Sequence, residues 1–552
     1  MKKLLLTTII VLLAAIMVLG SCGEEETTSP TTTTSPTTSP VTTTSPTATT
    51  SPTTTTSPTT SPTTTISPTT TDTSKYGGTL RFILWTSPSG TGGLPWELFA
   101  NDFLSSQHII EPFVHIDGEG NLIPCLAESY QVADDLMSVT FSLREGVKFH
   151  DGSDFNAQAA KWNLDNTMAN PMTASPYWES VDIIDDYTIR INLNQWVNTI
   201  LSGFASTSTW MVSFEAFNQN GEDWMRENPV GTGPFKFVSF ERDVSYKAER
   251  NPDYWQEGKP YLDAVEILYV ADPLTQKAAL EAGEADVLQI EPGKNAADLK
   301  AEGFSMAVSV ESTFVLMPDT AHPDSPFAIK EVREAVGYAL DRESLANAFS
   351  YGFWEAPYQI PDPSSLVYDP DFALLREYSV DKAKQLMSEA GLDEGFNATL
   401  LVIPVGIDQN IPVAIQTNLS DIGINLELNI PAAIPKFMED SNTLTNVLIL
   451  QPIFGGVNWN GALSFALRPD LMMMNTVWLR TPEFIELYNT TLSSPTMDIV
   501  LIRAVTDYLS EEAQLIPVFS GGTGFAYSSY VMDGDWHNRE ADWNPETIWI
   551  DK

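Results

Sequence analysis

Hydrophobic and polar residues alternate most regularly over residues 138–143, where the sequence reads SVTFSL. This pattern predicts an antiparallel strand with one buried and one exposed face. Glu145-Gly146 is a turn signal, and the alternation resumes over residues 147–149, which predicts a second strand. Asn156 is a favourable N-cap, and the apolar residues after it follow helical spacing. The segment therefore predicts a two-stranded unit packed on a helix.

The same criteria predict further elements along the chain. A strand is expected at residues 79–85, followed by a flexible loop at Pro88–Pro95 that is rich in glycine and serine. We predict a hairpin at 181–193, strands at 262–270, 285–290, 424–430 and 515–519, and helices at 274–282, 329–341, 379–391, 414–423 and 497–512. Strand, helix and strand in this order between residues 262 and 290 are typical of a parallel sheet, and the fold class is α/β.

The first residues have the features of an export signal. Lys2 and Lys3 precede a mostly apolar run from Leu4 to Leu19, and Leu19-Gly20-Ser21-Cys22 matches a bacterial lipobox. We therefore predict a lipoprotein signal peptide at 1–21 and a lipid anchor on Cys22. The other cysteine, Cys125, then has no intrachain partner and is expected to be a small buried apolar residue.

Residues 22–75 have the composition of a tether. From Thr27 to Thr71 the chain is almost entirely Thr, Ser and Pro and carries no charge, so it cannot bury a core. We predict a disordered segment that spans on the order of 140 Å when fully extended, at about 3 Å per residue. A passive spacer and an O-glycosylated stalk are both compatible with this composition.

The composition excludes several classes of function. With 72 acidic and 29 basic residues, the formal net charge is −43, which argues against nucleic acids or anionic membrane surfaces as partners. The five histidines form no pair at helical spacing, and the common hydrolase and metalloprotease motifs are absent from the sequence. We expect no metal, no cofactor and no catalytic residues, although a pair of glycosidase carboxylates cannot be identified or excluded by spacing.

Several motifs resemble one known family. The motifs are Leu126–Tyr130 (LAESY), Phe141–Arg144 (FSLR), Gly146–Gly152 (GVKFHDG), Phe155–Ala157 (FNA), Pro229–Phe235 (PVGTGPF), Arg250–Trp255 (RNPDYW), and a helix with Val332, Arg333, Ala335, Ala339, Asp341 and Arg342. Together they resemble the extracellular solute-binding proteins of the peptide, nickel and oligosaccharide class that serve ABC importers. The segment Asp135–Ser138 departs from the spacing usual in that family.

The resemblance implies a class II periplasmic-binding-protein-like fold, with two α/β lobes around a cleft and a subdomain inserted in the first lobe. We place lobe I at 76–112, 228–318 and 505–552, the inserted subdomain at 113–227, and lobe III at 319–504. The glycines of Pro229–Phe235 are expected to form a turn that needs backbone angles other residues resist.

The function implied by the resemblance is that of a lipid-anchored extracytoplasmic receptor. It would capture an oligopeptide or similar small solute and, as a monomer, deliver it to the permease subunits of an ABC transporter at the cell membrane. Two alternatives remain open at this point: an anchored extracellular hydrolase, and a solute-binding protein that feeds a sensor.

The resemblance also implies ligand-binding residues, namely Trp85, Trp354, Asn458 and Trp459. Peptide-binding relatives carry an aspartate that pairs with the peptide α-ammonium where Asn458 stands in this chain. Oligopeptides are the family's usual solutes, but a neutral Asn458 favours a solute without a free α-amino group, such as an oligosaccharide or a blocked peptide. Alternatively, Trp85 and Trp459 are core residues and Asn458 is a turn residue.

Overall fold

The computed structural model describes residues 73–98, 102–117, 119–170, 177–308, 310, 312–372, 374–404, 407–455, 459, 461–468, 476–534, 536 and 543–551. These residues belong to one compact unit, Thr71–Lys552. None of the described helices is long and apolar enough to cross a bilayer. The predicted signal peptide, Cys22 and most of the predicted tether lie outside the described residues.

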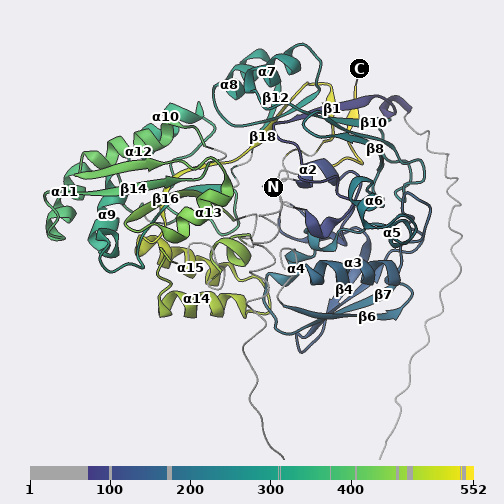
Figure 1. Ribbon diagram of the computed structural model, residues 1–552, viewed down its shortest axis with the longest axis horizontal. Helices are drawn as coiled ribbons and strands as arrows, with labels where there is room; N and C mark the ends of the chain where they lie inside the picture. Colours follow the sequence, from purple (N-terminus) through teal and green to yellow (C-terminus); the bar gives the residue numbers. More distant parts are fainter. Residues whose placement is uncertain are drawn as a thin grey trace, which may run out of the picture. The chain divides into compact units, whose positions relative to one another are not determined.

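The first large sheet has seven strands in the order β12-β18-β11-β1-β10-β9-β8 (Figure 1). Its strands are β1 (Thr79–Leu84), β8 (Phe235–Glu241), β9 (Ser245–Arg250), β10 (Ala264–Tyr269), β11 (Val287–Ile290), β12 (Ser305–Val308) and β18 (Gly524–Tyr527). Strand β1 pairs in parallel with β10 and β11, which confirms the predicted strand-helix-strand unit around α7 (Pro273–Glu281).

A buried carboxylate holds the returning C-terminal segment on this sheet. Asp286 is fully buried at the start of β11 and accepts hydrogen bonds from the Arg81 guanidinium at 3.1 and 3.2 Å. The Tyr530 hydroxyl donates to the same carboxylate at 2.9 Å. Segments that lie far apart in the sequence are thereby joined around one buried charge, and the bound cation offsets the cost of burying it.

The second large sheet has five strands in the order β15-β14-β16-β13-β17 (Figure 1). Its strands are β13 (Ser312–Pro318), β14 (Phe396–Val402), β15 (Ile424–Asn429), β16 (Val447–Phe454) and β17 (Ile516–Gly521). Helices α9 (Lys330–Ala339), α10 (Arg342–Ser350), α11 (Val380–Glu389), α12 (Asn410–Ser420) and α13 (Ile434–Thr443) surround it. Strand β13 pairs with β16 on one side and with β17 on the other. The domain bounds set out above stay a prediction.

A four-stranded antiparallel sheet, β4-β5-β7-β6, lies between β1 and β8 in the sequence. It comprises β4 (Ala127–Val132), β5 (Ser138–Leu143), β6 (Trp178–Asp185) and β7 (Thr188–Leu193), and α3 (Ala157–Ala169) packs beside it. The predicted hairpin is confirmed, since β6 pairs antiparallel with β7. The predicted helix start is also confirmed, since the Asn156 side chain accepts the backbone N–H groups of Gln158 and Ala159. We call residues 113–227, which contain this sheet, the inserted subdomain.

The remaining elements are short or join the sheets. They are η1 (Thr73–Lys75), η2 (Pro95–Glu97), α2 (Phe103–Ser106), β2 (Val114–Ile116), β3 (Leu122–Pro124), α4 (Ile200–Gly203), η4 (Thr207–Thr209), α5 (Phe214–Asn220), α6 (Glu222–Glu227), α8 (Lys294–Glu302), η5 (Pro326–Ala328), the π-helical turn η6 (Ala462–Ala466), α14 (Pro482–Leu492), α15 (Ile499–Glu511), β19 (Val531–Met532) and β20 (Trp549–Ile550). The helix predicted at 329–341 is α9, which the 3-10 turn η5 precedes, and a second helix starts at Arg342.

The strand predicted at residues 147–149 is wrong. Val147 and Phe149 are buried as the alternation implies, but the segment makes only one isolated bridge, between Lys148 and Asp154. Its backbone bonds instead close a tight loop, with the Phe149 N–H donating to Ser153 O and the Phe155 N–H donating to Val147 O. Burial therefore came from a loop that folds back on itself, without a partner strand.

The loop Pro88–Pro95 is packed, contrary to the predicted flexibility. Thr91 is buried and its carbonyl accepts the Tyr246 hydroxyl at 2.8 Å. A Cβ at Gly93 would lie 1.6 Å from the Met225 carbonyl oxygen, which shows that another backbone occupies this space. The glycines here serve close packing.

The glycines of Pro229–Phe235 allow two backbone segments to pack closely. The unusual backbone angles predicted for them are not found. Gly231 and Gly233 do not have positive φ. Instead, a Cβ at Gly231 would lie 2.0 Å from the Ile109 carbonyl oxygen, and a Cβ at Gly233 would lie 2.7 Å from the same atom. The motif therefore lets the chain re-enter the seven-stranded sheet directly against the segment by which it left.

A buried glutamate joins the same segments. The Glu111 carboxylate accepts hydrogen bonds from the hydroxyls of Tyr254 and Thr232, each at 2.7 Å, and from the Trp255 indole N–H at 3.0 Å. The thiol of Cys125, which is buried as predicted, lies 3.9 Å away. Burial raises the pKa of Glu111 to about 7, and the hydrogen bonds oppose this rise. We call these five residues the Glu111 cluster.

We expect Glu111→Gln to reduce the pH dependence of stability. Because the pKa of Glu111 is higher in the folded chain than its ordinary value of 4.5, the folded state keeps the proton longer, and stability falls as pH rises from about 4.5 to about 7. This fall contributes at most about 3 kcal/mol to the free energy of unfolding. Urea unfolding at several pH values checks it, with Glu128→Gln on exposed β4 as the control. Equal pH slopes in the wild type and Glu111→Gln would contradict the assignment.

Candidate functional site

Two short connections join the two large sheets. The first runs from Val308 at the end of β12 to Ser312 at the start of β13, and the second runs from Gly521 at the end of β17 to Gly524 at the start of β18. Gly524 pairs with Val308 on one side and with Ile290 on the other. Ser312 likewise pairs with Gly521 and with Phe454. The connections therefore join the strand ends on one side of the seven-stranded sheet to the strand ends on one side of the five-stranded sheet. We call these two rows of strand ends the facing edges.

The facing edge of the seven-stranded sheet is the carboxyl edge of its parallel strands. The register pairs Ile83 with Leu288, so Trp85 follows β1 close to where Glu291 follows β11. The predicted ligand residue Trp85 thus lies at this edge, with its side chain half-buried. In open α/β sheets, ligands bind beyond the carboxyl ends of parallel strands, and the position of Trp85 agrees with that rule.

The facing edge of the five-stranded sheet carries two aromatic side chains. Phe454 ends β16 and is 59 % exposed. The predicted ligand residue Trp354 stacks on Phe519 with ring centroids 4.5 Å apart, and Phe519 stacks in the same way on Phe314. A Cβ at Gly521 would lie 2.7 Å from the Trp354 ring, so the indole covers the start of the second connection. Aromatic rings at such an edge offer an apolar surface to a solute.

Glu291 is the notable charged group at these edges. Its side chain is exposed, yet its pKa is raised, first because surrounding protein desolvates the carboxylate and second because of the Asp408 charge. Asp408 follows β14 on the other sheet and accepts the Asn410 N–H at the start of α12. Within the described part of the chain, no hydrogen bond or salt bridge reaches the Glu291 carboxylate, so its charge is uncompensated.

Sequence reasoning missed Glu291 and Asp408. The signal that could have pointed to Glu291 is its position, since it directly follows the buried strand of the predicted strand-helix-strand unit. With 72 acidic residues in the chain, nothing in the sequence distinguished it from solvated acids, because desolvation is a property of the folded chain.

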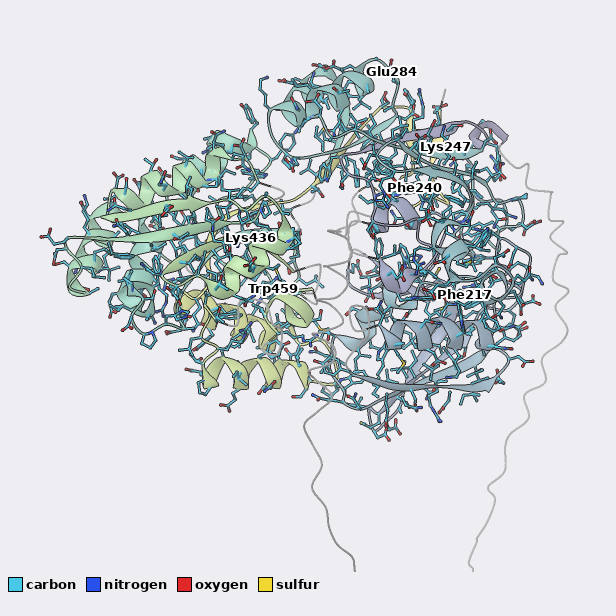
Figure 2. All side chains as sticks on the ribbon, viewed as in Figure 1. Phe217, Phe240, Lys247, Glu284, Lys436 and Trp459 are labelled. Carbon is cyan, nitrogen blue, oxygen red and sulfur yellow. The ribbon has the colours of Figure 1, made fainter. Side chains whose placement is uncertain are left out.

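The other predicted site residues are less accessible. Trp459 (Figure 2) is 1 % exposed, has a φ of 66° and packs in the hydrophobic core, so in this structure its ring is not available to a solute. Asn458 and Cys22 lie outside the described residues. The role of these residues in binding or anchoring stays a prediction.

The described residues at the facing edges present aromatic rings and one desolvated carboxylate. Among the described residues, no three histidine, cysteine or acidic side chains gather into a group that could hold a metal ion. His322 donates to or accepts from Asp319 at 2.8 Å, but this pair follows the far end of β13, away from the facing edges. No serine or cysteine side chain in the described part bonds to the His322 ring, so the pair lacks a nucleophile.

Solved structures with this arrangement are periplasmic binding proteins. The chain superposes on NikA from Brucella suis in complex with Fe(III)-EDTA with a TM-score of 0.77 at 21 % identity, covering 86 % of this chain and 100 % of that one. It superposes on the oligopeptide-binding protein AppA from Bacillus subtilis, in complex with a nonapeptide, with a TM-score of 0.68 at 22 % identity over 87 % of this chain and 100 % of that one. The fold is therefore that of class II periplasmic binding proteins, as predicted.

The chain belongs to the bacterial extracellular solute-binding proteins, family 5, whose model matches residues 121–525. The glutathione-binding protein GsiB from Salmonella typhi is 33 % identical over 319 residues, and that from Escherichia coli O157:H7 is 34 % identical over 318 residues. Each match covers 54 % of this chain and 60 % of the relative. The family membership inferred from the sequence motifs is confirmed, and the proteins of this family are binding proteins.

We expect Glu291→Gln to stabilise the chain slightly at neutral pH. The substitution removes a desolvated charge and its repulsion by Asp408, although solvent screens part of both effects. The gain should be under about 1 kcal/mol and should disappear in acid, where the raised pKa leaves the wild-type carboxyl neutral. Thermal unfolding at neutral and acidic pH checks this, with Glu427→Gln on β15 as a matched control. A lower melting temperature for Glu291→Gln would show that an unidentified group compensates the carboxylate.

Proposed function

We propose that this chain is the extracytoplasmic solute receptor of an ABC importer, and that it captures an oligopeptide or similar small solute between the facing edges. The observation that carries the proposal is the arrangement of these edges in a family 5 chain, with Trp85 and Glu291 on one edge and Trp354 and Phe454 on the other. The two connections would let the sheets close on the solute, which must bind the closed form more tightly to shift the equilibrium.

The names of similar proteins support a small organic solute without identifying it. AppA from Bacillus subtilis was solved with a nonapeptide and DppA from Helicobacter pylori, which has a TM-score of 0.71 at 20 % identity, with the peptide STSA. The GsiB proteins are named for glutathione. All three solutes are peptides, and peptides are the solute class that we propose this chain delivers for import.

The solute can be identified by equilibrium capture. Purified chain is incubated with pools of free peptides, their N-acetylated counterparts and oligosaccharides, and bound molecules are identified by native mass spectrometry. Recovery of an intact solute, followed by calorimetric titration, supports a receptor. Accumulation of cleavage products would replace the proposal with an extracellular hydrolase. An intact solute that binds without any uptake into cells carrying the permease would favour a sensor.

We further propose that position 458 influences which solute the chain prefers. An asparagine offers a neutral hydrogen bond where peptide-binding relatives carry an aspartate, so we propose a solute without a free α-amino group. Charged hydrogen bonds contribute about 1.5–3 kcal/mol against about 1 for neutral ones, so we expect Asn458→Asp to strengthen binding of free-amino peptides about tenfold. Calorimetry with free and acetylated peptides measures this. Tight binding of free peptides alone by the wild type would contradict it, and the Glu291 carboxylate would then be the candidate partner of the ammonium group.

We further propose that Cys22 carries the lipid that anchors the chain to the cell membrane. Cys22→Ser should move the folded chain from the membrane fraction to the soluble fraction, because each buried CH₂ of an acyl chain contributes about 0.8 kcal/mol. Fractionation followed by immunoblotting measures the distribution, and circular dichroism of the released protein checks that it remains folded. A variant that stays in the membrane fraction after removal of its signal peptide would refute the anchor.

A further inference from the structure

A segment of the inserted subdomain is bound to the end of α14. The Asn198 N–H donates to Leu492 O at 2.9 Å, and the Asn198 side-chain amide donates to Thr491 O at 2.8 Å. The Trp196 indole N–H donates to Ser494 O at 3.1 Å. Thr491 O and Leu492 O belong to the last turn of α14, whose carbonyls have no partner within the helix itself, and Ser494 follows the helix two residues later.

The segment is buried as well as hydrogen-bonded. Every residue from Trp196 to Ile200 is less than a tenth exposed, and Asn198 is only 3 % exposed. Trp196 and Ile200 belong to the same contiguous hydrophobic cluster as Leu492 of α14 and Leu509 of α15. The contact is therefore a packed interface with three aligned hydrogen bonds, between chain segments about three hundred residues apart.

This interface forms a second link between the two large sheets. The Glu111 cluster fastens the inserted subdomain to the segments that enter the seven-stranded sheet, because it includes Cys125 of the subdomain and because the Met211 N–H donates to Glu111 O at 3.2 Å. At its other end, the subdomain holds α14, which packs on α15 directly before β17 of the five-stranded sheet. Any bending at the two connections that moves the sheets apart must strain either the Glu111 cluster or the contact at Trp196–Ile200. The hydrogen bonds across the contact at Trp196–Ile200 reach one segment only, residues 491–494, whereas the Glu111 carboxylate is bonded from three different segments.

We propose that Trp196–Ile200 is a latch whose release from α14 accompanies opening of the facing edges. The inference rests on the proposed function in one respect, namely that opening admits the solute. The latch sets the population of the closed form in the absence of solute, and the apparent solute affinity scales with that population. Trp196 and Asn198 are thus positioning residues for binding without being required to touch the solute.

Hydrogen exchange of the full chain without solute tests the latch. Asn198→Ala removes the side-chain bond to Thr491 O, and Trp196→Phe keeps an aromatic ring but removes the bond to Ser494 O. Each should speed exchange of the residue 198 amide, and of peptides covering the end of α14, on the order of fivefold. Asn198→Asp should have a larger effect, because a carboxylate would face carbonyls at the negative end of a helix.

Asn166→Ala is the matched control. Asn166 also donates to a backbone carbonyl, that of Trp162, but within α3 of the same subdomain. It should leave exchange at residue 198 unchanged. Unchanged exchange at residue 198 in Asn198→Ala and Trp196→Phe would overturn the latch. So would faster exchange spread equally over β5 and β7, since this would show loss of the subdomain fold.

The two proposals fail separately. Exchange is measured without solute, so a chain that binds no peptide or oligosaccharide refutes the proposed function and leaves the latch result standing. Where a solute from the capture experiment binds, Asn198→Ala should weaken its apparent affinity, and saturating solute should slow exchange at residue 198 in the wild type. An affinity that stays constant while exchange accelerates would overturn the coupling of the latch to binding.

Discussion

Ser312 and Gly524 carry the constraint on which the architecture depends. Each is the terminal residue of a strand that pairs on both sides, Ser312 with Phe454 and Gly521, and Gly524 with Val308 and Ile290. The ends of the two connections therefore cannot shift along either sheet without breaking strand pairs. Because a one-residue slip in strand register would turn every side chain to the opposite face, this pairing fixes which edges of the two sheets are joined. The facing edges follow from it, and so does the position of the candidate site.

Local patterns were sufficient for the elements and insufficient for their partners. The alternation of Val139, Phe141 and Leu143 correctly predicted β5, and the Asn156 cap correctly predicted the start of α3. The same alternation failed at Val147 and Phe149, because burial on one face does not require a partner strand. The insertion of β18 between β11 and β12 joins residues more than two hundred positions apart, and no periodicity contains that information.

The candidate site was predictable to a similar degree. Resemblance to the family pointed to Trp85 and Trp354, and both lie at the facing edges. It also pointed to Trp459, whose ring is buried in the core in this structure. Glu291 could not be distinguished from other acids, because the same residue type is harmless when solvated and becomes a source of repulsion only when protein surrounds it. Packing determines this property, and packing is what the linear pattern leaves undetermined.

The basic residues show why the acidic groups at the site remain uncompensated. Three arginines outside the strands of the second large sheet bind backbone carbonyls: Arg333 donates to Glu512 O, Arg342 to Pro517 O, and Arg376 to Ser510 O. Ser510 O and Glu512 O lie at the end of α15, where a cation also interacts favourably with the negative end of the helix. Pro517 O lies in β17.

Burial lowers the pKa of Arg342 to about 10, so its guanidinium stays charged at neutral pH. Part of the small basic complement thus holds the strand that leads into the second connection, and those charges are unavailable to neutralise surface acids. Glu291 and Asp408 are consequently left to repel one another at the facing edges. An electrostatically unfavourable site on an otherwise stable frame is a common compromise in binding proteins, because stability is lost where a ligand can restore it.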